Sequence, residues 1–118
     1  MTTSSLEIKD PAYRVWYEPD DNTVYFEGKL RLAPGGYRPI EQLLKDVVDK
    51  EPSRIRLHLA ELQFLNSSGL SMLFKFVVQL RRKGTIPLSV RGSKAVLWHA
   101  KTLANIERFF PKAEIDLA

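Results

Sequence analysis

The chain has 118 residues and a formal net charge of +4, a size that suits one domain with one hydrophobic core. It contains no cysteine, which excludes disulfides, thiolate catalysis and cysteine-bound metals. No apolar run approaches the roughly 20 residues that cross a membrane, and the polar first residues lack the apolar core of a signal peptide, so we expect a cytoplasmic protein.

The first part of the chain predicts a β-hairpin. We expect residues 1–10 to be loose and flexible, or to add one short edge strand at Leu6–Ile8. Tyr13–Tyr17 alternates in the manner of a half-buried strand. Pro19–Asn22 is dense in turn formers, and Thr23–Leu30 then supplies the second strand.

A loop and an amphipathic helix follow the hairpin. Ala33–Pro39 breaks the pattern and predicts a loop, and the helix should begin near Pro39, since proline is tolerated at the first helical position. Glu51–Ser53 ends this helix. Its apolar residues recur at the spacing of one buried stripe: Ile40, Leu43, Leu44, Val47 and Val48.

The next predicted element is a strand at Arg54–Leu59. Its apolar side chains share one face, which should pack against the following helix: Ile55, Leu57 and Leu59. Arg56 and His58 fall on the other face, which favours a sheet with one open side. His58 has no companion histidine nearby, so we interpret it as a solvated or hydrogen-bonded side chain rather than a metal ligand.

The most informative stretch is Asn66-Ser67-Ser68, where this strand should give way to a helix. All three residue types favour the N-cap position of a helix. Two hydroxyl groups therefore stand at a helix N-terminus, which carries free N–H groups and partial positive charge. Such a place suits a phosphate, either bound or attached to serine. The alternative interpretation is that these residues only cap the helix.

A helix from about Ser68 to Lys83 leaves this junction. Its apolar arc contains Leu70, Leu73, Phe74, Val77, Val78 and Leu80, with Phe76 on the margin. Its polar face contains Ser71, Lys75, Gln79 and Arg82. Met72 points toward the polar side, and we interpret it as an exposed contact for a partner. Arg81–Lys83 complements the helix dipole, an interpretation that we prefer to a nucleic-acid patch, and Gly84 stops the helix.

The last part of the chain predicts one more strand and one more helix. The strand is Ile86–Val90, and Ser93 then caps a helix at Lys94–Arg108. The expected buried stripe of this helix is Val96, Leu97, Ala100, Leu103 and Ala104. Trp98 falls on the opposite face, where it either belongs to an interface or covers a neighbouring loop. Glu114–Leu117 forms a final short strand or a tail.

Together these elements predict a single α/β domain over residues 1–118. Strand–helix–strand crossovers within one sheet are parallel and right-handed, so the antiparallel hairpin should feed parallel strands in a mixed sheet with helices mainly on one face. The chain has no glycine-rich phosphate loop, no nucleophile elbow and no histidine pair with metal-ligand spacing. We therefore expect neither an enzyme nor a site for a cofactor or metal.

The segment Leu57–Leu70 resembles the signature of STAS domains, and specifically of the anti-sigma factor antagonist (anti-anti-sigma factor) family. In that family an apolar strand is followed by an Asp-Ser-Ser-Gly-Leu type turn and a helix. The resemblance covers about residues 54–111 and implies the STAS fold. Asn66 stands where aspartate is usual; it can cap the helix equally well, but it lacks the charge that a kinase would meet.

The resemblance implies a phospho-regulated binding module of a bacterial partner-switching system. It puts the phosphorylated residue at Ser67, with Ser68 as the alternative. If Ser67 is the phosphorylated residue, we expect Ser68 to cap the helix. The unphosphorylated form would bind an anti-sigma factor that is also a serine kinase, and so relieve the inhibition of a sigma factor. Phosphorylation with ATP would block binding, and a PP2C-type phosphatase would restore it. The residues that we expect at the partner surface are Asn66, Ser67, Ser68, Ser71, Met72, Lys75 and Trp98.

Three other functions remain open from the sequence. The first is a STAS-like adaptor that regulates a signalling enzyme such as a diguanylate cyclase. The second is a small hydrolase that uses Ser67 or Ser68, although no partner base is visible. The third is a nucleic-acid-binding domain, which only the net charge supports. We expect neither nucleic acid nor a membrane to be a direct partner.

Overall fold

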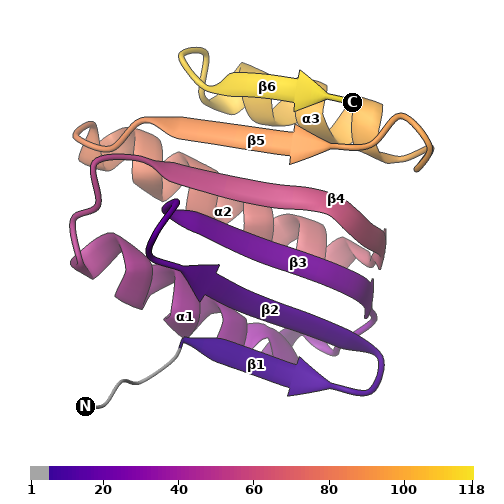
Figure 1. The fold of residues 1–118 in the computed structure, drawn as a ribbon. Helices are drawn as coiled ribbons and strands as arrows, with labels where there is room; N and C mark the ends of the chain where they lie inside the picture. Colours follow the sequence, from indigo (N-terminus) through magenta and orange to yellow (C-terminus); the bar gives the residue numbers. More distant parts are fainter. Residues whose placement is uncertain (1–5) are drawn as a thin grey trace.

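The structure, a computed structural model, describes residues 6–118 and contains one six-stranded sheet (Figure 1). The strands are β1 (Glu7–Asp10), β2 (Tyr13–Glu18), β3 (Thr23–Leu30), β4 (Ile55–Leu65), β5 (Leu88–Gly92) and β6 (Glu114–Leu117). The helices are the 3-10 helix η1 (Pro34–Tyr37) and the α-helices α1 (Arg38–Asp49), α2 (Ser67–Lys83) and α3 (His99–Phe109).

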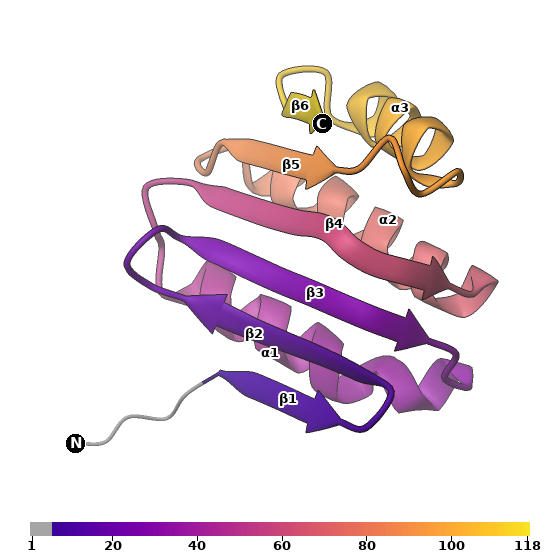
Figure 2. The ribbon, with the colours of Figure 1, turned by 45° about the vertical axis from the view of Figure 1, so that its right-hand side comes forward.

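The strands follow one another across the sheet in chain order, from β1 to β6. The pairs β1–β2 and β2–β3 are antiparallel, and the pairs from β3 to β6 are parallel. Because right-handed crossovers here always advance in the same direction, they bring every α-helix to the same face of the sheet. The helices α1 and α2 lie behind the sheet in Figures 1 and 2, and α3 lies behind β6 in Figure 1. The predicted STAS-like mixed sheet with helices on one face is therefore confirmed.

Two N-terminal segments are more regular than expected. Glu7–Asp10 pairs with β2, so the optional edge strand is present and these residues are not loose. The expectation for residues 1–5 lies outside the described residues. Pro34–Tyr37, expected within a loop, forms the turn η1, which leads directly into α1 with Pro39 in its first turn.

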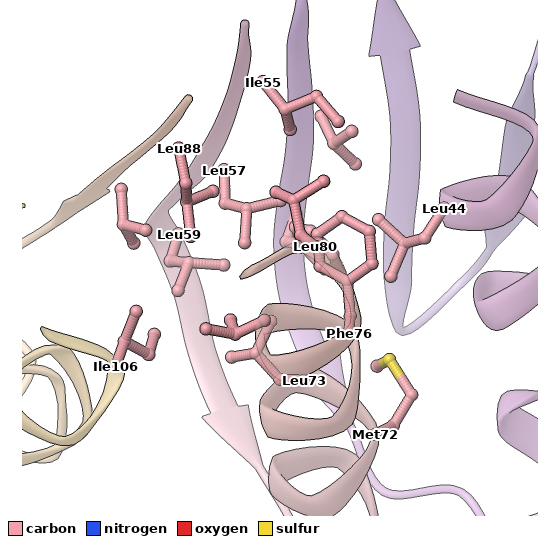
Figure 3. Packing of buried hydrophobic residues seen from close by; sticks show 14 of the residues in the cluster. Leu44, Ile55, Leu57, Leu59, Met72, Leu73, Phe76, Leu80, Leu88 and Ile106 are labelled. Atoms are coloured by element: carbon pink, nitrogen blue, oxygen red, sulfur yellow. The ribbon is translucent and has the colours of Figure 1, made fainter. Parts of the chain in front are cut away.

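The core lies between the sheet and the helices (Figure 3). The apolar face of β4 is fully buried and consists of Ile55, Leu57 and Leu59. Leu73 and Val77 of α2 are equally inaccessible, at 1% and 0% exposure, whereas Leu70 is half-buried. The predicted apolar faces of β4 and α2 therefore both belong to the core, with Leu70 at its margin.

The burial of Met72 corrects the predicted orientation of α2. Met72 is 5% exposed rather than solvent-facing, and Phe76 is 7% exposed rather than marginal. Figure 3 shows both side chains on the side of α2 that faces Leu44 of α1. A helical wheel predicts one buried stripe, the one that faces the sheet. Because α2 also packs against α1, its buried face extends further toward α1 than the wheel predicts.

The boundaries of two strands differ from the prediction. β4 continues to Leu65 instead of ending at Leu59, and it reaches the serine junction directly. β5 begins at Leu88, since Pro87 has no N–H for the ladder. The carbonyl of Pro87 still accepts a hydrogen bond from Ile55 N–H at 3.0 Å. The C-terminal segment is a strand, β6, rather than a tail.

The start of α3 is the largest error of the prediction. Ser93 does not cap a helix; its Oγ accepts a hydrogen bond from Ala95 N–H at 3.1 Å, which closes a turn. The helix begins only at His99. Leu97, expected in the core, therefore lies in the preceding loop and is 94% exposed. The buried residues of α3 are His99, Thr102, Leu103 and Ile106, whereas Ala100 and Ala104 are exposed.

Candidate partner-binding site

Asn66 joins three segments at the start of α2. Its Oδ1 accepts a hydrogen bond from Gly69 N–H at 3.0 Å, which caps the helix, and a second one from the Tyr37 hydroxyl at 2.6 Å. Its Nδ2 donates to the Leu32 carbonyl at 2.9 Å. A carboxylate at this position would cap the helix but has no donor for that carbonyl. The amide that replaces the usual aspartate therefore has a structural use of its own.

Tyr37 supports Asn66 from the start of α1. The side chain is 1% exposed, and its hydroxyl also lies 3.3 Å from the Leu30 carbonyl. Burial raises the pKa of the Tyr37 phenol above its ordinary value of 10.0. The hydroxyl therefore stays protonated at physiological pH and donates to Asn66. No motif marked Tyr37 as part of the site, because its contact with Asn66 bridges residues far apart in the chain.

Gly69 is required by close packing. A Cβ atom there would lie 2.2 Å from Leu65 Cδ1 and 2.7 Å from the Tyr37 hydroxyl oxygen. Both distances are well inside van der Waals contact, so a larger residue would push the first turn of α2 away from β4 and η1. The glycine of the Ser-Ser-Gly sequence thus lets the helix start lie against its neighbours.

Ser67 and Ser68 occupy the first two positions of α2. Ser67 is exposed and Ser68 is half-buried. The expectation that Ser68 caps the helix is wrong, because Asn66 does so. Among residues 6–118, the N–H groups of Ser67 and Ser68 have no hydrogen-bond acceptor. They give this exposed helix end its partial positive charge.

A hollow of about 340 Å³ lies beside the serines. Its lining residues come from η1, α1 and α2: Pro34, Tyr37, Glu41, Ser68, Ser71, Met72 and Lys75. Ser71 and Lys75 are exposed, as predicted, whereas Met72 contributes to the lining from its buried position. Four of the predicted partner-surface residues therefore surround one depression, although Met72 is not a free surface side chain.

Trp98 is only half-buried and does not belong to an exposed helix face. It precedes α3, and its indole Nε1 donates a hydrogen bond to the Gln63 carbonyl near the end of β4, at 2.9 Å. The ring also packs edge-on against His99, with 4.3 Å between centroids. The expectation of a largely exposed Trp98 is therefore wrong. The side chain covers the end of the strand β4, whereas the alternative from the sequence was that it covers a loop.

His58 lies on the open face of the sheet, as expected. Its ring packs on Tyr25 at a centroid distance of 4.9 Å, and Tyr25 in turn stacks on Trp16 at 5.0 Å. Burial lowers the pKa of the imidazole. The side chain is half-buried and its Nδ1 has no hydrogen-bond partner among the described residues, so packing on Tyr25 positions the ring on that side. No group of three potential metal ligands occurs within residues 6–118.

The sequence model of the STAS domain matches residues 38–111. The chain belongs to the STAS domain family. The match spans α1 to the end of α3 and includes the whole Asn66–Gly69 junction. No sequence among the curated proteins matches the chain significantly.

Solved structures share the fold of this STAS domain at low sequence identity. SiaC of Pseudomonas aeruginosa superposes with a TM-score of 0.66 and 16% identity, covering 98% of this chain and 97% of that chain. The complex of the diguanylate cyclase SiaD with its activator SiaC from the same organism gives 0.72 and 12%, with 95% and 98% covered. An anti-sigma factor antagonist from Mycobacterium paratuberculosis gives 0.57 and 19%, with 94% and 84% covered.

The described part of this STAS domain, residues 6–118, contains no helix that is both long and apolar enough to cross a bilayer.

Sequence reasoning missed three groups in the region around the start of α2: Tyr37, Glu41 and the Gln63 carbonyl that accepts a hydrogen bond from Trp98. Glu41 stands on the polar side of the predicted first helix, which was a usable signal for the rim of the hollow. The other two depend on contacts between distant segments.

Proposed function

We propose that this STAS domain is a phospho-regulated binding module of a partner-switching system in the cytoplasm. In its unphosphorylated form it binds an anti-sigma factor with serine kinase activity and relieves the inhibition of a sigma factor. Phosphorylation of Ser67 blocks that binding, and a PP2C-type phosphatase reverses the block. The observation that supports this proposal is an exposed hydroxyl at the first position of α2, on a helix start that other residues hold in place.

The surroundings of Ser67 favour a switch that acts through charge. A phosphate adds about −1.5 to −2 charges, which the free N–H groups and dipole of the helix N-terminus tolerate. Inside an interface the same charge must lose its hydration, and a cost of a few kcal/mol weakens binding about 100-fold or more. Ser67 makes no side-chain hydrogen bond to the described residues, so its modification leaves the Asn66 contacts unchanged.

The exposure of the two serines favours Ser67 over Ser68 as the acceptor. A kinase must surround the hydroxyl group, and Ser67 is exposed whereas Ser68 is half-buried in the wall of the hollow. Consecutive helical residues point about 100° apart, so the two hydroxyls are not interchangeable.

The test is affinity capture from the native cells with wild-type protein and two variants, Ser67→Ala and Ser67→Glu. We expect mass spectrometry to find the phosphate on Ser67, and to find an anti-sigma kinase captured by the wild type and by Ser67→Ala but not by Ser67→Glu. Ser53→Ala, at an exposed position between α1 and β4, is the matched control and should behave as the wild type. Phosphate on Ser68 in the Ser67→Ala protein, or equal capture by Ser67→Glu, would refute the assignment.

A second candidate function is an adaptor that regulates a diguanylate cyclase. The observation that favours it is the fold similarity to SiaC, seen in complex with SiaD, over nearly the whole of both chains. The same capture experiment separates the candidates by the class of enzyme retained. For this candidate, the retained cyclase should convert GTP faster after the purified domain is added, and Ser67→Glu should remove that effect.

A further inference from the structure

The hollow beside the serines is one end of a longer groove between α1 and α2. A second cavity of about 590 Å³ continues from it and shares three lining residues with it, Glu41, Met72 and Lys75. Along α2 the groove runs from Ser68 to Gln79, and along α1 it runs from Arg38 to Asp49. At 1.5 Å per residue, each wall is about 16 Å long, or three helical turns.

The groove has an apolar floor. Met72, Phe76 and Leu80 supply it from α2, and Leu44 and Val48 supply it from α1. Its length and apolar floor match the face that an amphipathic helix of three turns presents at positions i, i+3, i+4 and i+7.

The two walls of the groove differ in charge. The α2 wall contains Ser68, Ser71, Lys75 and Gln79, with one cation and no carboxylate. The α1 wall is mixed and contains Arg38, Glu41, Gln42, Lys45 and Asp49. The ion pairs among the described residues involve other side chains, so these charges are not neutralised by ion pairs within residues 6–118. The α2 wall therefore complements an acidic edge of a ligand.

We propose that this groove binds an amphipathic helix of the partner protein, with its apolar face on the floor and an acidic edge along α2. The inference rests on the proposed function and specifies which partner segment the domain binds and where. The groove is continuous with the serine junction, since Ser68 lines it two helical turns before Lys75.

The same geometry explains how a phosphate at Ser67 opposes binding. The α2 wall is free of negative charge only while the serines are unmodified. A phosphate at the first position of α2 lies next to Ser68 at the end of the groove, where its negative charge would repel the acidic edge of the docked helix. Like charges brought together at an interface are strongly unfavourable. The phosphate therefore acts on the ligand directly, and no rearrangement of the domain is needed.

The test uses the ¹⁵N-labelled domain and a synthetic 15-residue helical peptide with leucine on one face and glutamate along its edges. A peptide with lysine at each glutamate position is the matched control ligand. We expect amide shifts along Arg38–Asp49 and Ser67–Gln79, and binding of the lysine peptide about tenfold weaker. Lys75→Glu should reverse this preference, and Lys101→Glu, at an exposed position of α3, should not change it.

Three results would overturn the inference: shifts centred on the open sheet face around Tyr25, equal binding of the two peptides, or no saturable binding at millimolar peptide. Lys75 is exposed, so its substitution should preserve the fold, and the spectrum reports this directly. If the cellular partner is captured and released by phosphorylation but Lys75→Glu leaves capture unchanged, only the groove fails. If the peptides bind as expected but Ser67 is never phosphorylated, only the proposed function fails.

Discussion

The helices α2 and α3 each follow a parallel strand and a residue that favours the N-cap position, but their starts are built differently. At α2, Asn66 accepts a hydrogen bond from the N–H three residues ahead, which is the geometry of a helix cap. At α3, Ser93 accepts from the N–H two residues ahead, and no side chain caps the helix. The ring of His99 fixes this second start instead: its Nδ1 accepts a hydrogen bond from Ser93 N–H at 2.9 Å, and its Nε2 donates to the Leu62 carbonyl at 2.8 Å.

This comparison shows when a capping residue predicts a helix start. The prediction holds where the backbone that follows has no competing partner, as at Asn66. It fails at Ser93, whose own N–H donates to the buried His99 ring and whose Oγ accepts from Ala95 N–H, so that a turn forms there instead of a helix. The two helix starts also differ in the side chains that they expose to solvent. The α2 start leaves the Ser67 hydroxyl in solvent, whereas imidazole and indole rings fill the α3 start.

The largest effect should come from removing the ring that fixes α3. His99 is completely buried, so His99→Ala leaves a cavity and two unpaired backbone groups, and we expect a loss of about 3–5 kcal/mol. Urea unfolding monitored by circular dichroism measures it. Glutamine at this position keeps a donor for the Leu62 carbonyl and should recover part of the loss. A loss of less than about 1 kcal/mol for His99→Ala would mean that the hydrogen bonds of His99 do not determine where α3 starts.

Acid should lower the stability of the fold through both histidines. Burial lowers the pKa of both His99 and His58 below the ordinary value of 6.5. The unfolded chain then binds protons at a higher pH than the folded chain. Stability is therefore complete above about pH 6.5 and falls as the pH drops from there through the lower pKa of the folded state. Unfolding free energies at about pH 7.5 and about pH 5.5 test this. A His99→Gln protein should show a smaller difference, and unchanged pH dependence would contradict the assignment.

At the α2 start, Gly69→Ala should be the most damaging change. The new methyl group would overlap Leu65 and the Tyr37 hydroxyl, and overpacking of this kind costs about 1–3 kcal/mol. Thermal unfolding measures the loss. Gly35→Ala is the matched control, since a Cβ there meets nothing within 4 Å. Equal stability of the two variants would show that the helix start can shift without cost.

Asn66→Asp tests whether the amide itself matters. The aspartate restores the residue usual in the family and can still cap α2, but it loses the donor to the Leu32 carbonyl, and we expect a loss of about 1–2 kcal/mol at neutral pH. Tyr37→Phe, which removes the other side-chain bond to Asn66, should cost a similar amount. If Asn66→Asp is as stable as the wild type, the bond to Leu32 contributes nothing.

The smallest effect should come from Ser93→Ala. Its hydroxyl closes an exposed turn rather than a helix, so we expect a change of less than about 0.5 kcal/mol, compared with about 0.5–2 kcal/mol for a true cap. The matched variant is Asn66→Ala, which removes the real cap of α2. A larger loss for Ser93→Ala than for Asn66→Ala would reverse the comparison on which these predictions depend.

The sequence was sufficient for features that depend on local pattern. The order of the elements, the apolar face of β4 and the position of Ser67 follow from alternation, helical spacing and residue type. The orientations of Met72, Leu97 and Trp98 did not follow, because distant segments decide them. Met72 is buried by α1, and Leu97 is exposed because the bond between His99 and Leu62 delays the helix. Single-element patterns contain no information about such neighbours.

The bonds that Asn66 makes to Tyr37, Leu32 and Gly69 have a consequence for the speed of the proposed switch. They join the exit of β3, the entry of α1 and the entry of α2 into one corner immediately beside the Ser67 hydroxyl. If Ser67 is phosphorylated as we propose, the phosphate is added to a helix start that these bonds already hold, so partner binding changes without a slow rearrangement of the domain. The response time of such a system would then be set by the abundance of the kinase and the phosphatase.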